Sequence, residues 1–231
     1  MSSARAVVLL SGGLDSTTVT AVAKNQGYEL YALSFDYSQR HGRELEAARM
    51  VAQYFGCAQW HVIPLSLSLW GGSALTMDAE VPKGRSLEEM ESAIPVTYVP
   101  ARNTLFIAYG LAYAEAIDAE AIFVGVNAVD YSGYPDCRPE YVAKYRELID
   151  LATKKTVEGG RIELKTPLIH LTKAEIIRLG MENGAPYHLT WSCYEGGEKA
   201  CGQCDSCQLR LRGFQEAGLA DPIAYTEPYL R

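Results

Sequence analysis

The sequence predicts an α/β fold, with a doubly wound, mainly parallel sheet followed by a short C-terminal helical segment. Short apolar runs rich in β-branched residues alternate with longer segments of helical periodicity, which is typical of βαβ units. A Ser-Gly-Gly turn separates the first apolar run from the first helical segment. The chain has 231 residues, enough for one domain with its own core plus an appendage.

The expected elements follow in the order that such a sheet requires. Apolar runs bounded by turn residues predict strands at 7–10, 30–35, 60–65 and 121–126. Helical spacing, with a terminal glycine or a capping residue, predicts helices at 16–27, 43–55, 103–117 and 172–183. The helix at 103–117 is apolar nearly all round and should be buried on more than one side. The stretch 66–100 is expected to be a long loop of the kind that forms a lid or a binding loop.

Ligands bind parallel sheets of this kind at the carboxyl ends of the strands. The segments that directly follow predicted strands are therefore the places to look for a site. They are 11–16, 36–42, 127–138 and 166–173.

Composition and charge exclude several classes of protein. Hydrophobic residues make up 48% of the chain and charged residues 21%, so it is neither disordered nor collagen-like. The net charge of −7 argues against a stable nucleic acid complex, although a local basic pocket can still hold a small anion. No apolar run is as long as a membrane span and no signal peptide is evident, so we expect a cytoplasmic protein without membrane partners.

The hexapeptide Ser-Gly-Gly-Leu-Asp-Ser at 11–16 lies between the first strand and the first helix. Glycines let successive N–H groups approach a phosphate, and the helix N-terminus adds free donors. Ser11, Ser16 and Thr17 offer hydroxyls, and Asp15 offers a carboxylate for Mg²⁺. The Walker lysine is absent, so this is not a Walker P-loop. A plain turn capped by Asp15 or Ser16 is the structural alternative, but the whole hexapeptide favours phosphate binding.

Four of the six cysteines lie close together near the C-terminus, in the pattern Cys193-x7-Cys201-x2-Cys204-x2-Cys207. Four thiolates at this spacing can close a tetrahedron around Zn²⁺ and leave no open position, so the zinc would be structural. An iron–sulfur cluster or the reactive thiols of a sulfur-transfer enzyme are the alternatives. We expect residues 1–187 to form the α/β domain and residues 188–231 the zinc-binding segment.

The hexapeptide resembles the mark of the PP-loop ATP pyrophosphatase superfamily, which cleaves ATP between the α and β phosphates. Further characteristic stretches lie at 35–41, 99–103, 131–138, 166–168 and 173–175, and at 190–193 through 207–210. Together with the two motifs, they make the chain resemble the 7-cyano-7-deazaguanine synthase family of queuosine biosynthesis over nearly its whole length. Ser38 stands where the family pattern leads us to expect glycine.

This resemblance implies an adenine-nucleotide α-hydrolase-like fold and an ATP-dependent carbon–nitrogen ligase. The reaction it implies converts 7-carboxy-7-deazaguanine, ammonia and ATP into 7-cyano-7-deazaguanine through an adenylated acid and an adenylated amide. Mg²⁺ and preorganised cations would stabilise the phosphate charge in both steps. The candidate catalytic residues are Asp15, Arg102, Lys173 and Arg210, and those for nucleotide binding are Leu10, Ser11, Gly12, Gly13, Leu14, Asp15, Ser16, Thr17, Thr18, Arg40 and His41.

The loop at 127–138 is the candidate substrate site. A guanine-like edge offers two adjacent donors that a carboxylate accepts, and a tyrosine can stack on the ring plane. An acid-capped turn with tyrosines over the core is the structural alternative. The candidates are Asn127, Asp130, Tyr131, Tyr134, Asp136 and Arg138, while Cys137 is a conceivable nucleophile that adenylation makes unnecessary.

Three other functions compete with this one. A PP-loop sulfurtransferase acting on tRNA would need a basic surface, which the net charge argues against. An ammonia-dependent amide synthetase leaves the four cysteines without a role, and a nucleotide-binding zinc adaptor would release no pyrophosphate. The apolar tail at 220–231 is expected to pack back on the domain or across a homodimer.

Overall fold

The computed structural model describes residues 3–37, 42–76, 82–85, 94–129 and 134–226. Within them, five strands form one parallel sheet in the order β3-β2-β1-β4-β5. β1 lies at the centre, with Val7 paired to Tyr31 on one side and to Ile122 on the other. The strands are β1 (Arg5–Leu9), β2 (Glu29–Asp36), β3 (Gln59–Pro64), β4 (Ala121–Phe123) and β5 (Glu163–Lys165).

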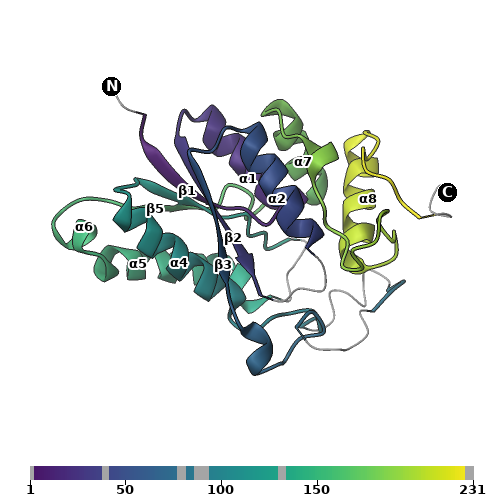
Figure 1. Ribbon diagram of the computed structural model, residues 1–231, viewed down its shortest axis with the longest axis horizontal. Coiled ribbons are helices and arrows are strands. Elements are labelled where there is room, and N and C mark those ends of the chain that lie inside the picture. The colour runs from purple at the N-terminus through teal and green to yellow at the C-terminus, as the bar shows by residue number, and fades with distance from the viewer. Residues whose placement is uncertain (1–2, 38–41, 77–81, 86–93, 130–133, 227–231) are drawn as a thin grey trace.

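Helices cover both faces of this sheet, as Figure 1 shows. The α4 and α5 helices pack on the face that carries Leu33 and Ile122, and α1, α2 and α7 pack on the face that carries Ala32 and Phe123. The helices are α1 (Leu14–Asn25), α2 (Arg43–Tyr54), α4 (Arg102–Ala116), α5 (Pro139–Ala152), α6 (Lys154–Val157), α7 (Lys173–Glu182) and α8 (Asp205–Ala217). The predicted doubly wound α/β class is therefore confirmed.

The predicted helix at 103–117 exists as α4, but its expected burial on more than one side is wrong for the single chain. Ile107, Leu111 and Ala114 are buried against the sheet, whereas Tyr109 is 42% exposed. Alanine and tyrosine on the outer face of α4 made the sequence look uniformly apolar, although only one stripe meets the core.

Two strands differ from the sequence expectation, each for its own reason. β4 ends at Phe123, since the following Gly125 passes against α1, where a β-carbon would lie 3.1 Å from the Ser16 nitrogen. β5 was not predicted, because its three residues carry no alternating pattern.

The C-terminal segment packs on the α/β layers through α8. Phe214 shares the core beneath α1 and α7, and Figure 1 shows α8 beside α7. The predicted tail packing is confirmed for residues 221–226, because Ala200 N–H donates to the Ala224 carbonyl and Thr226 N–H donates to the Ala200 carbonyl. The proposed boundary at 187/188 stays a prediction.

Candidate active site

A cavity opens at the carboxyl ends of β1 and β4, where the direction of strand addition reverses. Such a switch point is the usual ligand position in open α/β sheets. Segments far apart in the sequence meet there, among them the loop after β1, the first turn of α2, the start of α4 and α7, and the stretch that follows η3 (Tyr187–Leu189). Its polar lining includes Ser11, Asp15, Ser16, Glu44, Arg102, Asn127, Tyr134, Lys173, Ser192 and Arg210.

The loop at 11–16 has the close packing that its glycines predict. Gly12 has φ of +84°, and a β-carbon there would lie 2.3 Å from the Glu44 carbonyl oxygen. Only glycine permits this approach of the loop to α2. Helix α1 begins at Leu14 rather than at Ser16, so Ser16 lies in the first turn, where its hydroxyl contacts the Ser11 hydroxyl at 3.0 Å and the Gly13 carbonyl at 3.1 Å.

Not all of the predicted nucleotide-binding residues line the cavity. Leu10, Ser11, Gly13, Leu14, Asp15 and Ser16 do. Thr17 and Thr18 lie behind the loop instead, and the Thr18 hydroxyl contacts the Leu14 carbonyl at 3.0 Å and the Tyr187 hydroxyl at 2.7 Å. These two threonines were expected at the nucleotide because they follow Ser16, but the helical turn carries them inward. Arg40 and His41 lie outside the described residues.

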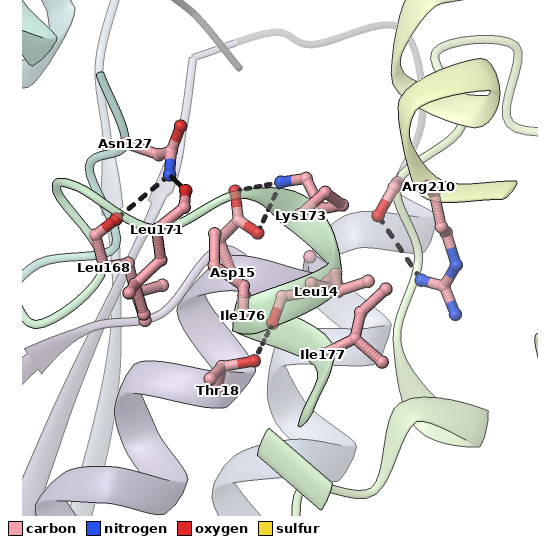
Figure 2. A network of polar contacts seen from close by, with 12 residues as sticks. Leu14, Asp15, Thr18, Asn127, Leu168, Leu171, Lys173, Ile176, Ile177 and Arg210 are labelled. Atoms are coloured by element: carbon pink, nitrogen blue, oxygen red, sulfur yellow. Dashed lines mark hydrogen bonds and ion pairs between the residues drawn. The ribbon is translucent and has the colours of Figure 1, made fainter. Parts of the chain in front are cut away.

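Asp15 and Lys173 form an ion pair at the floor of the cavity, with Lys173 Nζ 2.7 and 2.9 Å from the two carboxylate oxygens (Figure 2). Lys173 is the first residue of α7, and the predicted capping box fixes that start. Thr172 N–H donates to Glu175 Oε2 at 2.8 Å, and Glu175 N–H donates to Thr172 Oγ1 at 3.3 Å. The pair places a cation and a carboxylate beside the loop at 11–16.

Asn127 connects the loop that follows β4 with the loop that follows β5. Its amide donates to the carbonyls of Leu168, at 3.0 Å, and of Leu171 (Figure 2). Its oxygen accepts from Val129 N–H at 2.9 Å. Asn127 was predicted to bind the substrate. It lines the cavity, but its side-chain nitrogen and oxygen form hydrogen bonds with backbone groups. It therefore holds the 166–173 segment in place beside the site.

Asp136 does not line the cavity, contrary to the expectation that it accepts from the substrate edge. Its Oδ2 accepts from Asn103 N–H at 3.0 Å, so it caps the N-terminus of α4. That helix start has no side chain of its own at the cap, because Ala101 stands there in the left-handed region with φ of +53°. The structural alternative for this residue was a local acid-capped turn, whereas the observed contact joins Asp136 to a helix start 33 residues earlier in the chain.

The other candidates in the substrate loop are divided. Tyr134 lines the cavity, and its hydroxyl lies 2.9 Å from the Thr97 hydroxyl. Arg138 is exposed outside the cavity and donates to the Pro135 carbonyl at 3.1 Å. Asp130 and Tyr131 lie outside the described residues. Burial raises the pKa of the Cys137 thiol to about 12, which is the opposite of an activated nucleophile.

Arg102 and Arg210 both border the cavity, but their surroundings differ. Arg102 lies 3.4 Å from the Tyr37 hydroxyl and over the ring of Phe106. Arg210 is 2% exposed and forms a paired contact with Asp221, with Nε to Oδ2 at 2.7 Å and Nη2 to Oδ1 at 2.8 Å. Its Nη1 contacts the Thr190 hydroxyl at 2.7 Å. Arg210 therefore secures the tail as well as forming cavity wall.

Sequence reasoning missed Glu44. It lies two residues beyond the segment 36–42, which follows the second strand. Its side chain lines the cavity from the first turn of α2. Burial raises the pKa of its carboxyl group to about 7, while Arg102 opposes the shift and Cys193 adds to it. The signal that could have found it is position, since a polar residue in the first turn after β2 must lie near the strand ends.

The four predicted cysteines come together next to this cavity. The sulfurs of Cys193, Cys201, Cys204 and Cys207 all lie within 4.8 Å of one another. Cys204 and Cys207 are brought together by the start of α8, and the N–H groups of residues 195 and 201 donate to Cys193 Sγ. Such a donor set fits a metal ion that prefers sulfur ligands. Cys193 also lines the cavity, so the two sites adjoin.

In the parts of the chain that are described, no helix is long and apolar enough to cross a membrane.

The fold and the loop between β1 and α1 define an open α/β protein whose glycine-containing loop lies at the topological switch point of the sheet. The model of the family described as queuosine biosynthesis protein QueC matches residues 5–218, and the chain belongs to this family. It is 58% identical over 222 residues to a 7-cyano-7-deazaguanine synthase of Thermosynechococcus vestitus, covering 96% of this chain and 95% of that protein. A protein of the same name from Acetivibrio thermocellus is 58% identical over 224 residues, covering 96% and 98%.

Among solved structures, the chain is similar to an NMN synthetase from Francisella tularensis, with 14% identity and a TM-score of 0.49 over 99% of this chain and 90% of that one.

Proposed function

We propose that this chain is an ATP-dependent ligase that converts 7-carboxy-7-deazaguanine and ammonia to 7-cyano-7-deazaguanine. The observation that carries the proposal is the meeting of the phosphate loop at 11–16 with the Asp15–Lys173 ion pair in one cavity. The name of the relatives that are 58% identical agrees with it.

A carboxylate must be activated before nitrogen can replace its oxygen. Attack of the substrate carboxylate on the α-phosphorus of ATP forms the adenylate and releases pyrophosphate, and ammonia then displaces AMP to give the amide. A second adenylation, on the amide oxygen, allows elimination of AMP to leave the nitrile. Negative charge grows on the phosphates in both adenylations, so fixed cations close to the loop lower the barriers.

The cavity residues divide these tasks. Ser11, Gly13 and the first turn of α1 would bind the phosphates. Lys173 and Arg102 would stabilise the negative charge that develops on them. Asp15 would hold Mg²⁺, which when bound neutralises phosphate oxygens. Arg210, with its guanidinium engaged by Asp221, would act mainly by fixing the cavity wall.

The substrate ring would lie toward Tyr134, with Asp130 and Tyr131 as further candidates for its polar edge. Asn127 would contribute by fixing the adjoining loop.

The four cysteines would hold a structural Zn²⁺ and tie residues 193–207 into one unit. We extend the proposal to a cytoplasmic homodimer that takes free ammonia and forms no stable complex with nucleic acid.

The test is a reaction of the protein with 7-carboxy-7-deazaguanine, ammonium, ATP and Mg²⁺, with nitrile, amide, AMP and pyrophosphate measured by mass spectrometry. Nitrile and AMP should form together, and the Asp15→Ala variant should be slower by about 100-fold or more. Absence of pyrophosphate in the wild-type reaction would refute the ligase. Pyrophosphate that appears only when tRNA is added would instead indicate a sulfurtransferase.

A further inference from the structure

The cavity contains a carboxylate that the proposed adenylation chemistry does not use. Glu44 lies in the first turn of α2, and the loop at 11–16 packs directly on that turn at Gly12. The side chain is partly buried and forms, among the described residues, no hydrogen bond or ion pair. It is therefore held beside the phosphate loop by backbone packing, with its oxygens uncommitted.

Of the other carboxylates predicted for the site, Asp15 is engaged and Asp136 lies outside the cavity. Both oxygens of Asp15 contact Lys173 Nζ, at 2.7 and 2.9 Å. Asp136 caps α4 with Oδ2, its Oδ1 is buried with no hydrogen-bond partner among the described residues, and the residue does not line the cavity. Of the acidic side chains that line the described part of the cavity, Glu44 is the one that is not held by a cation.

The proposed reaction needs a proton acceptor, because nitrogen enters as ammonia and ends as a nitrile nitrogen that carries no proton. Every proton that ammonia brings must leave the nitrogen within the site. A carboxylate within reach of that nitrogen can accept these protons one at a time and return each to water.

Resting on the proposed function, we propose that Glu44 is the general base that removes protons from the incoming nitrogen. In the first half-reaction, the nitrogen lone pair attacks the carbonyl carbon of the adenylate and the C=O π electrons move to oxygen. Glu44 takes one proton from nitrogen. The oxyanion then collapses, the bond from carbon to the AMP oxygen breaks, and AMP leaves with the electron pair.

In the second half-reaction, Glu44 must remove two protons from the nitrogen. The amide oxygen attacks the α-phosphorus of a second ATP and pyrophosphate leaves, so the nitrogen becomes part of a cationic imidate. Glu44 removes one proton to give the neutral imidate and, after releasing that proton to water, removes the other. Those N–H electrons form the third C–N bond as the C–O bond to AMP breaks.

The surroundings of Glu44 agree with such a role. Burial keeps the pKa of the group near neutrality, at about 7, with Arg102 and Cys193 as the charged or titratable neighbours that modify it. A base with a pKa close to the working pH is efficient, because it is partly ionised and still accepts a proton readily.

The experiment compares Glu44→Gln with Glu44→Asp and with a matched control, Glu46→Gln. Glu46 lies on the same turn of α2, is exposed, and pairs with Arg49 at the surface. Three reactions are followed for each variant. They are pyrophosphate exchange into ATP with 7-carboxy-7-deazaguanine and no ammonium, amide and nitrile formation with ammonium, and hydroxamate formation with hydroxylamine.

Glu44→Gln should keep pyrophosphate exchange within about threefold of wild type and lose amide and nitrile formation by about 100-fold. Hydroxylamine is largely uncharged at neutral pH and a better nucleophile, so hydroxamate formation should fall by less than about tenfold. Glu44→Asp should recover part of the nitrile rate, and Glu46→Gln should behave as wild type.

Two results would overturn the inference while leaving the proposed function intact. One is a nitrile rate in Glu44→Gln within about threefold of wild type. The other is a parallel loss of pyrophosphate exchange, which would place Glu44 in adenylation or folding. A wild-type protein that forms neither pyrophosphate nor nitrile would overturn the proposed function itself, and this inference with it.

Discussion

Gly213 lies against the aliphatic stem of Lys173, so that a β-carbon at position 213 would be 2.3 Å from Lys173 Cγ and 2.9 Å from its Cβ. The two residues lie where α8 packs against α7. Because position 213 has no side chain, the Lys173 side chain can extend past it to reach Asp15. A residue in the C-terminal segment thus positions a cation in the cavity.

We expect Gly213→Ala to displace the Lys173 ammonium from Asp15. Pyrophosphate release should fall by about 10- to 100-fold, since small displacements of a catalytic group have effects of that size. The crowded crossing should also cost about 1–3 kcal/mol of unfolding free energy. Steady-state kinetics and urea unfolding measure the two effects. The exposed Gln215→Ala on the same helix is the control, and an unchanged rate in Gly213→Ala would refute the steric argument.

Removing one partner of the Arg210–Asp221 pair should destabilise the protein strongly, because the two side chains are only 2% and 3% exposed. Asp221→Asn leaves the guanidinium buried beside a neutral amide, so the unfolding free energy should fall by about 3–5 kcal/mol. Glu29→Gln, which breaks the exposed pair with Arg5, should cost about 1 kcal/mol or less. Equal losses in the two variants, measured by urea unfolding, would contradict the assignment of the buried pair.

Removal of metal should unfold the C-terminal segment first. Treatment with a strong chelator should release about one zinc ion per chain, as expected for a closed four-cysteine site, and the melting temperature should fall. Proteolysis should then cut within 193–207. Cys201→Ser should give the same result without a chelator, whereas Cys57→Ser should not, since Cys57 lies outside the cluster. A protein that contains no metal after purification in zinc-supplemented medium would contradict this prediction.

Glu44 should make stability depend on pH. Its pKa is about 7 in the folded protein and about 4.5 when exposed, so its stabilising contribution is present below pH 4.5 and is lost as the pH rises through 7. Glu44→Gln removes this loss. The melting temperature of the variant relative to wild type should therefore rise between pH 5.5 and 8, by the equivalent of about 2 kcal/mol. A difference that stays constant over that range in thermal melts would rule out this titration.

Much of the fold could be predicted because it depends on local signals. The strand before Ser11, the glycines at 12 and 13, and the pair Thr172 and Glu175 each fix a structure within a few residues of themselves. The cysteine cluster could be predicted for the same reason, since its spacing alone defines the donor set.

The rest of the site depends on contacts between distant segments, for which the sequence carries no local signal. Asp136 looked like a substrate ligand because it follows a strand, yet it caps α4, more than thirty residues earlier in the chain. Arg210 looked like a free anion-binding group, and its partner Asp221 could not be identified from spacing. Glu44 was missed because it lies two residues beyond the segment 36–42, where the search for site residues after β2 ended.

Under the proposed function, the loop at 11–16 has a consequence for the order of events. With both adenylations carried out at this loop, the first AMP and pyrophosphate must depart before the second ATP can arrive. The amide must either wait in the cavity during that exchange or leave and compete with fresh acid for re-entry. The relative residence times of amide and spent nucleotide would then decide whether the protein delivers nitrile alone or a mixture.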